Sequence, residues 1–303
     1  MRDWPPIPPS RRADGPSPPS EPAGTANCPP QDTVADLKER IKKDKRLAPA
    51  RQRLTVAGPG EGDRPVVLGD DATVASLGSR PVTLKDLGPQ VSYQAVFLAE
   101  YAAPLALYLA VYAYRFLLPG APAAASLTQK LAAGYWTLHF AKRLLETLLV
   151  HRFSRATMPV HNLLRNVAYY GLCGVFVSWF VNHPLYTAPA LGQTLGCLGA
   201  ALAMQALNLK CHLDLAALRA GGRTGYQVPR GWMFDLVCCP NYTTEILGWA
   251  LFTAAAQTAA AGIFTAVGAG TMAVWARQKY RRLRSTFSDA EYPRRKVLLP
   301  LVF

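Results

Sequence analysis

Ionisable and amide side chains interrupt the apolar segments in the C-terminal two thirds of this 303-residue chain. Each ionisable group costs about 2.5–3.5 kcal/mol at the centre of a membrane helix, so a large set of them needs a common explanation. One asparagine alone is explained by a hydrogen bond between helices. The whole set predicts a buried polar site open to the cytosol, and its members are Glu100, His139, Lys142, Arg143, Glu146, Asn208, His212, Asn241, Tyr242 and Glu245.

One group of these residues shares a helix face. His139, Lys142, Arg143 and Glu146 are spaced 3, 4 and 7 residues apart from the first in an otherwise apolar segment. Positions with this spacing lie on the same side of an α-helix. A polar stripe on a membrane helix faces the interior of the bundle or a water-filled cavity, so we expect this stripe to line the site.

A second group suits a ligand that carries phosphate and amide groups. His212 lies one helical turn after Asn208, and Arg219 lies about two turns further on, where a basic loop begins. Charged and amide donors in this arrangement can bind a dinucleotide. A helix cap together with an arginine whose charge reaches the membrane interface explains the same spacing. Periodicity alone leaves both interpretations open.

The segment from Cys239 to Glu245 reads CPNYTTE. Its proline ends the preceding element, Asn241 or Thr243 can cap the next helix, and Glu245 then falls in the first turn, where it favours the helix dipole. Capping does not explain Tyr242, which is either an aromatic anchor at the membrane interface or a functional group.

Composition limits the class of protein. Half of the residues are hydrophobic and the net charge is +14, with most of the basic excess in residues 91–303. The basic residues are separated by long apolar segments and form no continuous face, which favours lipid headgroups and phosphorylated ligands over nucleic acid. The six cysteines lack zinc-binding spacing, so we expect no metal site.

Three parts follow each other along the chain. Residues 1–30 form a tail rich in proline, serine and glycine, which we expect to be disordered. Residues 31–88 predict a small α+β segment, with a helix capped by Thr33 and short strands at 52–56 and 81–84. Residues 91–303 predict an all-α membrane-embedded domain.

Apolar segments predict the membrane topology. Residues 95–114, 127–150, 166–182 and 185–209 each suit one span, and residues 246–276 suit two helices that turn near Gly262. Six spans place the arginines and lysines of the loops mainly on one side. The positive-inside rule then puts both termini in the cytosol and the loop Asn182–Pro189 in the lumen.

Five motifs resemble the very-long-chain trans-2-enoyl-CoA reductases, which belong to the steroid 5α-reductase superfamily. The resemblance extends from Asp86 to Phe303 with the motifs in the order of that family. The motifs in this chain are LAEYAAPLALYL, KRLLETLLVHRFSRATMP, NHPLYTAP, CPNYTTEILGW and YPRRKVLLPLVF.

The resemblance implies a function and a site. It implies NADPH-dependent reduction of the C2=C3 double bond of a trans-2-enoyl-CoA in fatty-acid elongation, in the endoplasmic reticulum membrane, with other elongation enzymes as partners. It assigns Tyr242 as the acid and Glu100 as a carboxylate that faces the substrate. Phe140, where the steroid enzymes have tyrosine, argues against a steroid ketone. The residues implied in cofactor binding are Asn208, His212, Arg219, Asn241 and Glu245.

The chain also departs from the family pattern. In that family the N-terminal part is ubiquitin-like, and residues 33–88 resemble its second half, so 31–88 is expected to be a partial ubiquitin-like segment whose first two strands are missing. Leu283 and Ala216 replace a common tyrosine and arginine, and Asp289–Pro293 contains two extra residues. Other functions therefore remain open. They are reduction of another conjugated carbonyl such as a steroid or polyprenol, a non-catalytic paralogue that binds lipid or elongation partners, and an isoprenylcysteine methyltransferase, which shares a similar C-terminal topology.

Overall fold

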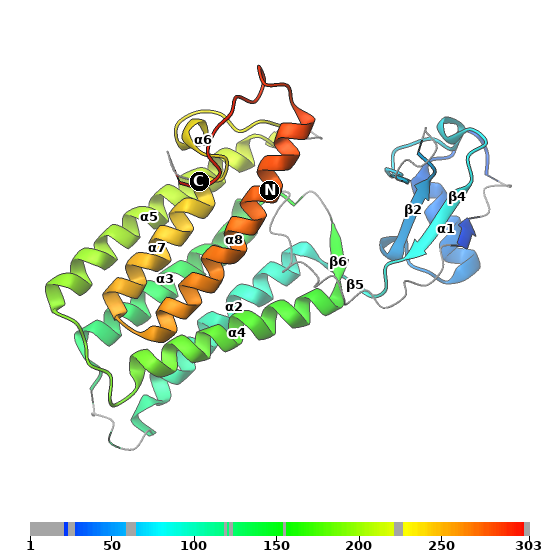
Figure 1. The fold of residues 1–303 in the computed structure, drawn as a ribbon. Coiled ribbons are helices and arrows are strands. Elements are labelled where there is room, and N and C mark those ends of the chain that lie inside the picture. Colours follow the sequence, from blue (N-terminus) through cyan, green and yellow to red (C-terminus); the bar gives the residue numbers. More distant parts are fainter. Residues whose placement is uncertain are drawn as a thin grey trace. The chain divides into compact units, whose positions relative to one another are not determined.

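The computed structural model describes residues 21–23, 28–58, 65–117, 120, 124–153, 156–220 and 227–299. These residues form two compact units, which we describe separately. The sheet unit contains the N-terminal α+β segment, and the helical unit contains the long helices that follow (Figure 1). The protein is therefore mostly helical with a small N-terminal β segment, as the sequence predicts.

Helix α1 (Val34–Lys45) forms because both of its ends are stabilised. The Thr33 side chain accepts a hydrogen bond from the Asp36 amide, and the Asp36 carboxylate accepts one from the Thr33 amide at 2.8 Å. This reciprocal cap satisfies two backbone donors that the helix leaves free. Lysines in the last turn favour the helix dipole, and Arg46 ends the helix in the left-handed conformation with φ 53°.

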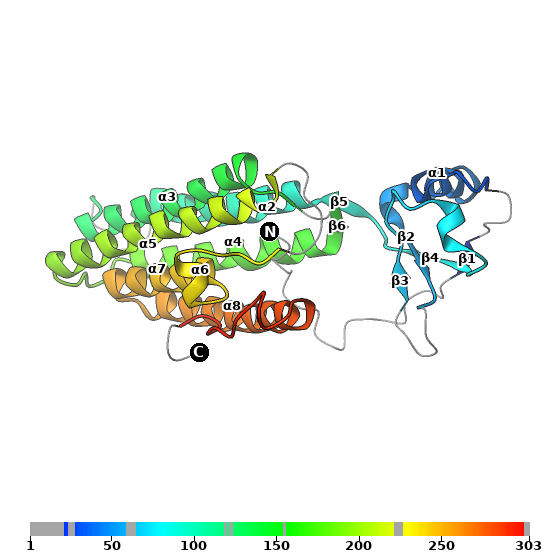
Figure 2. The same cartoon turned by 90° about the horizontal axis from the view of Figure 1, so that it is seen from above.

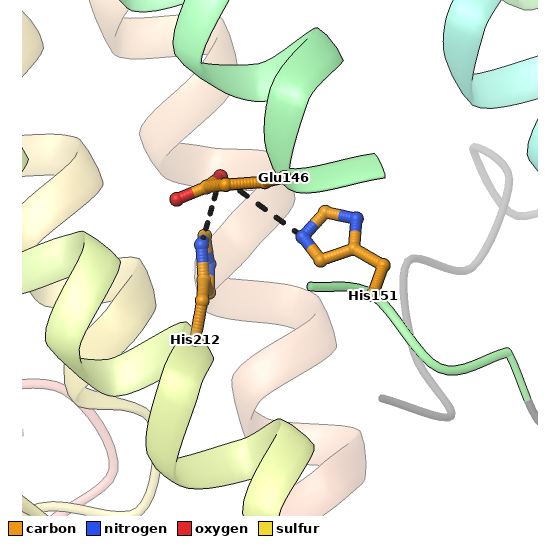
Figure 3. Close-up of side chains that lie close together, drawn as sticks. All are labelled: Glu146, His151 and His212. Atoms are coloured by element: carbon orange, nitrogen blue, oxygen red, sulfur yellow. Dashed lines mark ion pairs between the residues drawn. The ribbon is translucent and has the colours of Figure 1, made fainter. Parts of the chain in front are cut away.

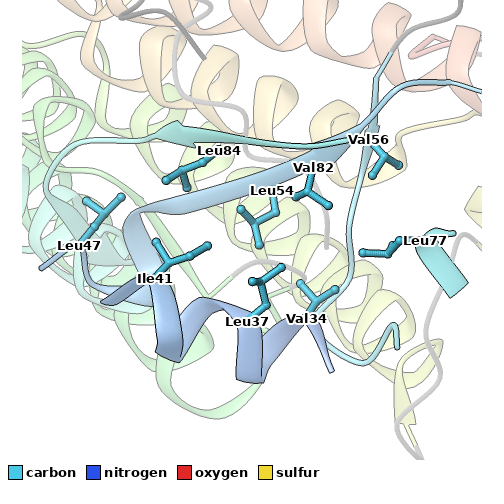
Figure 4. Close-up of a cluster of buried hydrophobic side chains, with 9 residues drawn as sticks. All are labelled: Val34, Leu37, Ile41, Leu47, Leu54, Val56, Leu77, Val82 and Leu84. Carbon is cyan, nitrogen blue, oxygen red and sulfur yellow. The ribbon is translucent and has the colours of Figure 1, made fainter. Parts of the chain in front are cut away.

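The sheet beside α1 has the strand order β1-β4-β2-β3, and all its neighbours are antiparallel. Alternate residues of β2 and β4 are buried, which directs one face of the sheet toward α1. The strands are β1 (Glu21–Ala23), β2 (Gln52–Val56), β3 (Val66–Val67) and β4 (Val82–Asp86). Figure 4 shows the aliphatic core, which contains Val34, Leu37, Ile41, Leu47, Leu54, Val56, Leu77, Val82 and Leu84.

The expectation that residues 1–30 are disordered is wrong at Glu21–Ala23, which pair with β4. An edge strand exposes unpaired backbone groups, and pairing along β4 satisfies them. Residues 1–20 and 24–27 lie outside the described residues. Short 3₁₀ helices at Pro49–Arg51 and Val74–Leu77 connect the strands, and β5 (Gln90–Ser92) pairs with β6 (Thr157–Pro159) in a separate ribbon of the same unit.

The helical unit is built from long helices that run along one another (Figure 1; Figure 2). Helix α5 packs along α7, α2 packs along α3, and α7 and α8 form a hairpin. The 3₁₀ helix Arg115–Leu117 follows α2. The helices are α2 (Tyr93–Tyr114), α3 (Leu127–Leu149), α4 (Val160–Asn182), α5 (Leu191–Ala217), α6 (Met233–Leu236), α7 (Pro240–Ala256) and α8 (Ala259–Thr286).

The turn between α7 and α8 does not lie near Gly262, where the sequence predicts it. Helix α7 ends at Gln257, which is left-handed with φ 45°, and the Thr258 side chain caps α8 by accepting from the Ala261 amide. Gly262 lies inside α8, where its amide donates to the Thr258 carbonyl. A threonine cap satisfies the first backbone donors of a helix, whereas a glycine within a helix is tolerated at modest cost.

Large apolar side chains lie on the outside of the helical unit. Two helical segments among the described residues are long and apolar enough to cross a membrane, Tyr93–Leu117 and Ala259–Thr286. The other long helices also carry outward-facing apolar side chains, a pattern that favours lipid over water as their surroundings. Examples are Leu145, Leu148, Leu149, Leu164, Leu172, Trp179, Phe180, Leu195 and Leu202.

Candidate active site

Glu146 is the centre of a buried ionic cluster. Its Oε1 forms an ion pair with Lys142 at 2.9 Å, and its Oε2 accepts a hydrogen bond from Arg143 at 2.7 Å on the same helix. His212 of α5 approaches the same carboxylate, with 3.0 Å between Nδ1 and Oε2. The Glu146 side chain is only 2% exposed. We call Lys142, Arg143, Glu146 and His212 the Glu146 cluster. In this cluster the charge of one lysine and the charge of one arginine share a single carboxylate.

Asn208 connects this cluster to α7. Its side-chain oxygen accepts from Lys142 at 2.7 Å, and its nitrogen donates to the Asn241 carbonyl at 2.8 Å. Asn208 therefore ties α3, α5 and α7 together at one level. The expectation that Asn241 or Thr243 caps α7 is wrong, because Pro240 begins the helix and the cap residue Cys239 makes no side-chain cap hydrogen bond.

His139 and Glu245 form a second buried pair, with 3.3 Å between Nε2 and Oε1. The Gln205 amide nitrogen lies 2.9 Å from His139 Nδ1, and an amide nitrogen can only donate. The proton of the neutral ring is therefore on Nε2, where it points at Glu245. Trp249 also donates to Glu245 at 3.1 Å, which fixes the carboxylate.

Glu100 lies on α2 with no exposed surface. It accepts a hydrogen bond from Asn166 of α4 at 2.9 Å. Glu100 Oε1, Asn166 Oδ1 and Asn241 Oδ1 are buried and have no hydrogen-bond partner among the described residues. Buried acceptors without partners are costly, so these three oxygens are suited to a ligand that brings N–H or O–H donors.

A cavity lies between α2, α3, α4, α7 and α8, and we call it the inner cavity. His139, Arg143, Glu245 and Asn166 contribute its polar groups, and Tyr101 contributes a phenol that accepts from Arg143 at 2.8 Å. Aromatic and aliphatic side chains form the rest of the wall. They include Phe140, Tyr169, Tyr170, Ile246, Trp249, Phe264, Met272 and Trp275.

The structure therefore brings together most of the predicted site residues. The helix face that carries residues 139, 142, 143 and 146 points into the bundle. His139 and Arg143 line the inner cavity, and Lys142 and Glu146 pair in the Glu146 cluster beside it. His212, Asn208, Asn241 and Glu245 join the same network through α5 and α7. Glu100 reaches it through Asn166, which lines the cavity.

Tyr242 and Arg219 lie apart from the inner cavity. Tyr242 is 2% exposed within an apolar cluster that includes Cys238, Leu283 and Tyr292, and it does not line the cavity. Arg219 follows the end of α5, and its guanidinium donates to the Arg152 carbonyl. Leu283, one of the departures from the family pattern, thus packs with Tyr242 rather than in the cavity.

Sequence reasoning missed His151 and Tyr101. The ring of His151 is completely buried, its Nε2 lies 4.0 Å from Glu146, and neither ring nitrogen has a hydrogen-bond partner among the described residues (Figure 3). Burial and the nearby Arg143 lower the pKa of His151 to about 2, so its ring is neutral. His151 follows α3, outside the helical periodicity that identified the other groups. Tyr101 resembles any tyrosine of an apolar helix.

Glu146, His151 and His212 place their ligand atoms within 4.8 Å of one another, which is a donor set that transition metals use (Figure 3). Arg143 already lies between them, because its NH1 is 2.7 Å from Glu146 Oε2 and 3.1 Å from His212 Nδ1. A divalent cation in the same place would face this guanidinium charge at contact distance. These residues therefore suit an organic ligand or an anion better than a metal ion.

Comparison with known proteins identifies the family. Residues 156–303 match the family model described as 3-oxo-5-alpha-steroid 4-dehydrogenase. The chain is 41% identical over 279 residues to a very-long-chain enoyl-CoA reductase of Dictyostelium discoideum, which covers 89% of this chain and 92% of that protein.

Two animal proteins show the same relationship. A Caenorhabditis elegans protein described as "Probable very-long-chain enoyl-CoA reductase" is 38% identical over 289 residues, 89% of this chain and 91% of that protein. A human protein described as "Trans-2,3-enoyl-CoA reductase-like" is 34% identical over 291 residues, 89% of this chain and 77% of that protein. The chain therefore belongs to the very-long-chain enoyl-CoA reductase family and contains its membrane-embedded steroid 5α-reductase domain.

Proposed function

We propose that the protein reduces the C2=C3 double bond of trans-2-enoyl-CoA with NADPH in very-long-chain fatty-acid elongation. The observation that carries this proposal is the inner cavity, in which buried charged groups meet a long aromatic and aliphatic wall. An enoyl thioester matches these two kinds of surface, because its reacting end is polar and its acyl chain is apolar. A relative at 41% identity is named a very-long-chain enoyl-CoA reductase.

The residues present fit a nicotinamide dinucleotide. The unpartnered oxygen of Asn166 on the cavity wall suits a carboxamide NH₂, and Glu245 on the same wall offers a further acceptor. Glu100 and Asn241 also carry buried unpartnered oxygens, but they do not line the cavity. Lys142 and His212 suit the phosphates. We propose that Asn208 and His212 position this binding region and that Arg219 holds a phosphate where α5 ends.

The chain's own residues then stabilise charge and supply a proton. NADPH, when bound, supplies hydride to C3 of the substrate. The electrons of the double bond move to the thioester oxygen, where Arg143 is suited to stabilise the enolate charge. We propose that Tyr101 donates its phenolic proton to C2, since its oxygen already accepts from Arg143 and the same guanidinium stabilises the resulting phenolate.

Tyr242 remains a second candidate for the acid. A tyrosine is protonated at neutral pH, since its reference pKa is about 10, and Tyr242 lies one helical turn from Glu245. Its position outside the cavity lining requires either a movement of α7 or a role in holding the neighbouring apolar cluster. Substitution of each tyrosine separates these possibilities.

The experiment uses purified protein in lipid nanodiscs with NADPH and trans-2-hexadecenoyl-CoA. We expect consumption of NADPH that depends on the enoyl-CoA, saturated acyl-CoA as product, and deuterium from labelled NADPH at C3. Saturated hexadecanoyl-CoA is the matched control and should leave NADPH unchanged. Binding of NADPH without turnover would support the non-catalytic paralogue, and absence of NADPH binding would contradict the proposal.

A second candidate is reduction of another conjugated carbonyl, since residues 156–303 match a family model described for a steroid dehydrogenase. Phe140 lines the cavity where the steroid enzymes have tyrosine, which favours the enoyl thioester. Offering a 3-oxo-4-ene steroid and a polyprenol substrate in the same assay decides between them. Faster turnover of either than of the enoyl-CoA would reverse our choice.

We further propose that six helices, α2 to α5 with α7 and α8, cross the endoplasmic reticulum membrane with both termini in the cytosol. The outward-facing apolar side chains of α3, α4 and α5 support spans beyond the two that length and composition identify. A glycosylation acceptor inserted with a spacer between Asn182 and Pro189 should be modified, and acceptors at the termini should not. The opposite pattern would reject this topology.

A further inference from the structure

The inner cavity is closed at its polar end and open at its apolar end. His139, Arg143 and Glu245 at the polar end are buried, with His139 only 2% and Arg143 3% exposed. The residues that face one another from α4 and α8 are half-buried instead, which shows where the cavity reaches the surface. These rim residues are Tyr169 and Tyr170 on α4 and Thr265, Gly268 and Thr271 on α8.

A second, shallow hollow lies beside this rim along the outside of α4. Tyr169 lines both the inner cavity and the hollow, so the two are adjacent at that side chain. The hollow runs along α4 from Tyr169 to Trp179. At a rise of about 1.5 Å per residue this is a length of about 15 Å. Its remaining lining is apolar and consists of Leu172, Cys173, Val175, Phe176 and Trp179.

Helix α4 is held in place on the opposite side. A side chain at Gly174 would come within 2.9 Å of the Pro104 backbone, and one at Gly171 would come within 3.0 Å of Leu107. Ser178 also donates to the Tyr108 carbonyl at 2.8 Å. Helix α4 is therefore packed closely on α2, and the opening lies on its side toward α8.

Gly268 keeps the opening wide on the side of α8. A Cβ atom built at Gly268 would meet only the Met272 Cε at 3.9 Å, so a larger side chain there would extend into the cavity. Gly270, two residues further, is exposed and does not line the cavity, and a Cβ there meets nothing within 4 Å. The two glycines form a matched pair on opposite faces of one helix.

We propose that the acyl chain of the substrate leaves the polar end between α4 and α8 and lies along the α4 hollow, and that Gly268, because it has no side chain, keeps this exit open for long chains. This inference rests on the proposed enoyl-CoA reduction. A chain that exits sideways into the lipid meets no end wall, so the site sets no upper limit on chain length. A short chain ends inside the cavity and never passes Gly268.

The test compares trans-2-hexenoyl-CoA with trans-2-octadecenoyl-CoA as substrates of the full-length protein in nanodiscs. A leucine side chain at position 268 would obstruct the exit that only a long acyl chain uses, because Gly268 lines the cavity. Gly268→Leu should therefore lower kcat/KM for the octadecenoyl substrate roughly tenfold or more relative to the hexenoyl substrate. Gly270→Leu, the matched control, should leave the ratio of the two values unchanged.

The possible outcomes are distinguishable. If the wild type reduces neither substrate, the proposed function fails. If the wild type reduces both substrates and Gly268→Leu lowers kcat/KM equally for both, the proposed acyl path is overturned. It is also overturned if Gly270→Leu changes the ratio of the two kcat/KM values as much as Gly268→Leu does. If Gly268→Leu does not fold, Gly268→Ala replaces it, since its Cβ fits at 3.9 Å from Met272. A smaller shift in the same direction is then expected, and no shift overturns the path.

A binding experiment tests the path without turnover. An octadecenoyl-CoA that carries a photoreactive group at its methyl end is irradiated with the wild-type protein and NADPH. We expect the label on the peptide that contains Leu172–Trp179, and we expect excess unmodified octadecenoyl-CoA to suppress it. Suppressible labelling of α2 or α5 instead would overturn the proposed path.

Discussion

The sheet unit and the helical unit bury opposite kinds of side chain. The core of the sheet unit is aliphatic (Figure 4). Its ion pairs lie outside the core, as between Lys42 and Glu39, whose side chains are more than half exposed. The helical unit encloses Glu146 at 2% exposure beside Arg143 and presents leucines on its surface.

The difference shows that each unit matches its surroundings and its task. Water favours an apolar core, whereas lipid removes the cost of exposed leucines. Lipid does not explain buried charges, because desolvating an ion pair costs about as much as its attraction returns. The charges of the helical unit are therefore best understood as parts of a site, and the predictions below test this.

The largest expected effect concerns the two tyrosines. Tyr101→Phe removes one oxygen from the cavity wall and should lower kcat for trans-2-enoyl-CoA by about 10²–10⁴, because general acid assistance is lost. Tyr242→Phe should retain near wild-type turnover if it only fills its apolar cluster. Both variants are measured at equal folded levels with NADPH binding verified. A large loss in Tyr242→Phe with normal Tyr101→Phe would return the role of acid to Tyr242.

The second prediction compares a buried carboxylate with an exposed one. Glu146→Gln leaves Lys142 and Arg143 without their carboxylate inside the helical unit and should destabilise it by about 3–5 kcal/mol. Glu39→Gln removes the exposed ion pair of α1 and should cost about 0.5 kcal/mol. Thermal unfolding in detergent, followed by proteolysis of each unit, measures both. Equal losses of stability in Glu146→Gln and Glu39→Gln would contradict the proposed difference between the two units.

A smaller effect is expected at the edge of the helical unit. If Arg219 holds a cofactor phosphate, Arg219→Ala loses a charge-assisted contact of about 1.5–3 kcal/mol and should raise the KM for NADPH roughly 10- to 100-fold. Arg219→Lys keeps the charge and should recover part of this loss. An unchanged KM in folded Arg219→Ala would leave Arg219 with only its contact to the Arg152 carbonyl.

The smallest effect is expected in the sheet unit. The hydrogen bond from Arg51 holds the pKa of Asp86 below its usual range. A carboxyl whose pKa is lowered by folding stabilises the fold above its unfolded pKa of about 3.9 and loses that contribution as the pH falls through the folded pKa. Both side chains are more than a third exposed, so the contribution is below about 1 kcal/mol.

Hydrogen exchange of the sheet unit within the full-length protein measures this pH dependence. Protection of β2 and β4 should decrease slightly below about pH 4 in the wild type. In Asp86→Asn the protection should already be lower at neutral pH and should change less on acidification. An identical pH profile in the two proteins would show that the pair contributes nothing.

Local patterns predicted the elements well. The cap at Thr33 and the spacing of Val34, Leu37 and Ile41 predicted α1 and its buried face. The apolar segments predicted the long helices, and the family motifs predicted the family. These features depend on residues close together in the chain, whose helical or alternating period decides which side is buried.

Local patterns failed where two alternatives differ by a tertiary contact. Gly262 and Thr258 both suit a helix boundary, and the capping of α8 by Thr258 decided between them. The tail segment Glu21–Ala23 shows no strand pattern, and its pairing depends on the free edge of β4. The sequence singled out Tyr242 and missed Tyr101, because only the packing of α2 against α3 sets the Tyr101 oxygen 2.8 Å from Arg143.

The sequence by itself determined that residues 91–303 form apolar helices with charged groups on their inner faces, because the helical period and the cost of exposing charge to lipid are local properties. Only the tertiary structure decided which charges meet. Glu146 pairs with His212, and His139 faces Glu245, although the residues of each pair lie more than sixty positions apart in the chain. Side-chain partners at that separation depend on how α3, α5 and α7 pack, which no local pattern encodes.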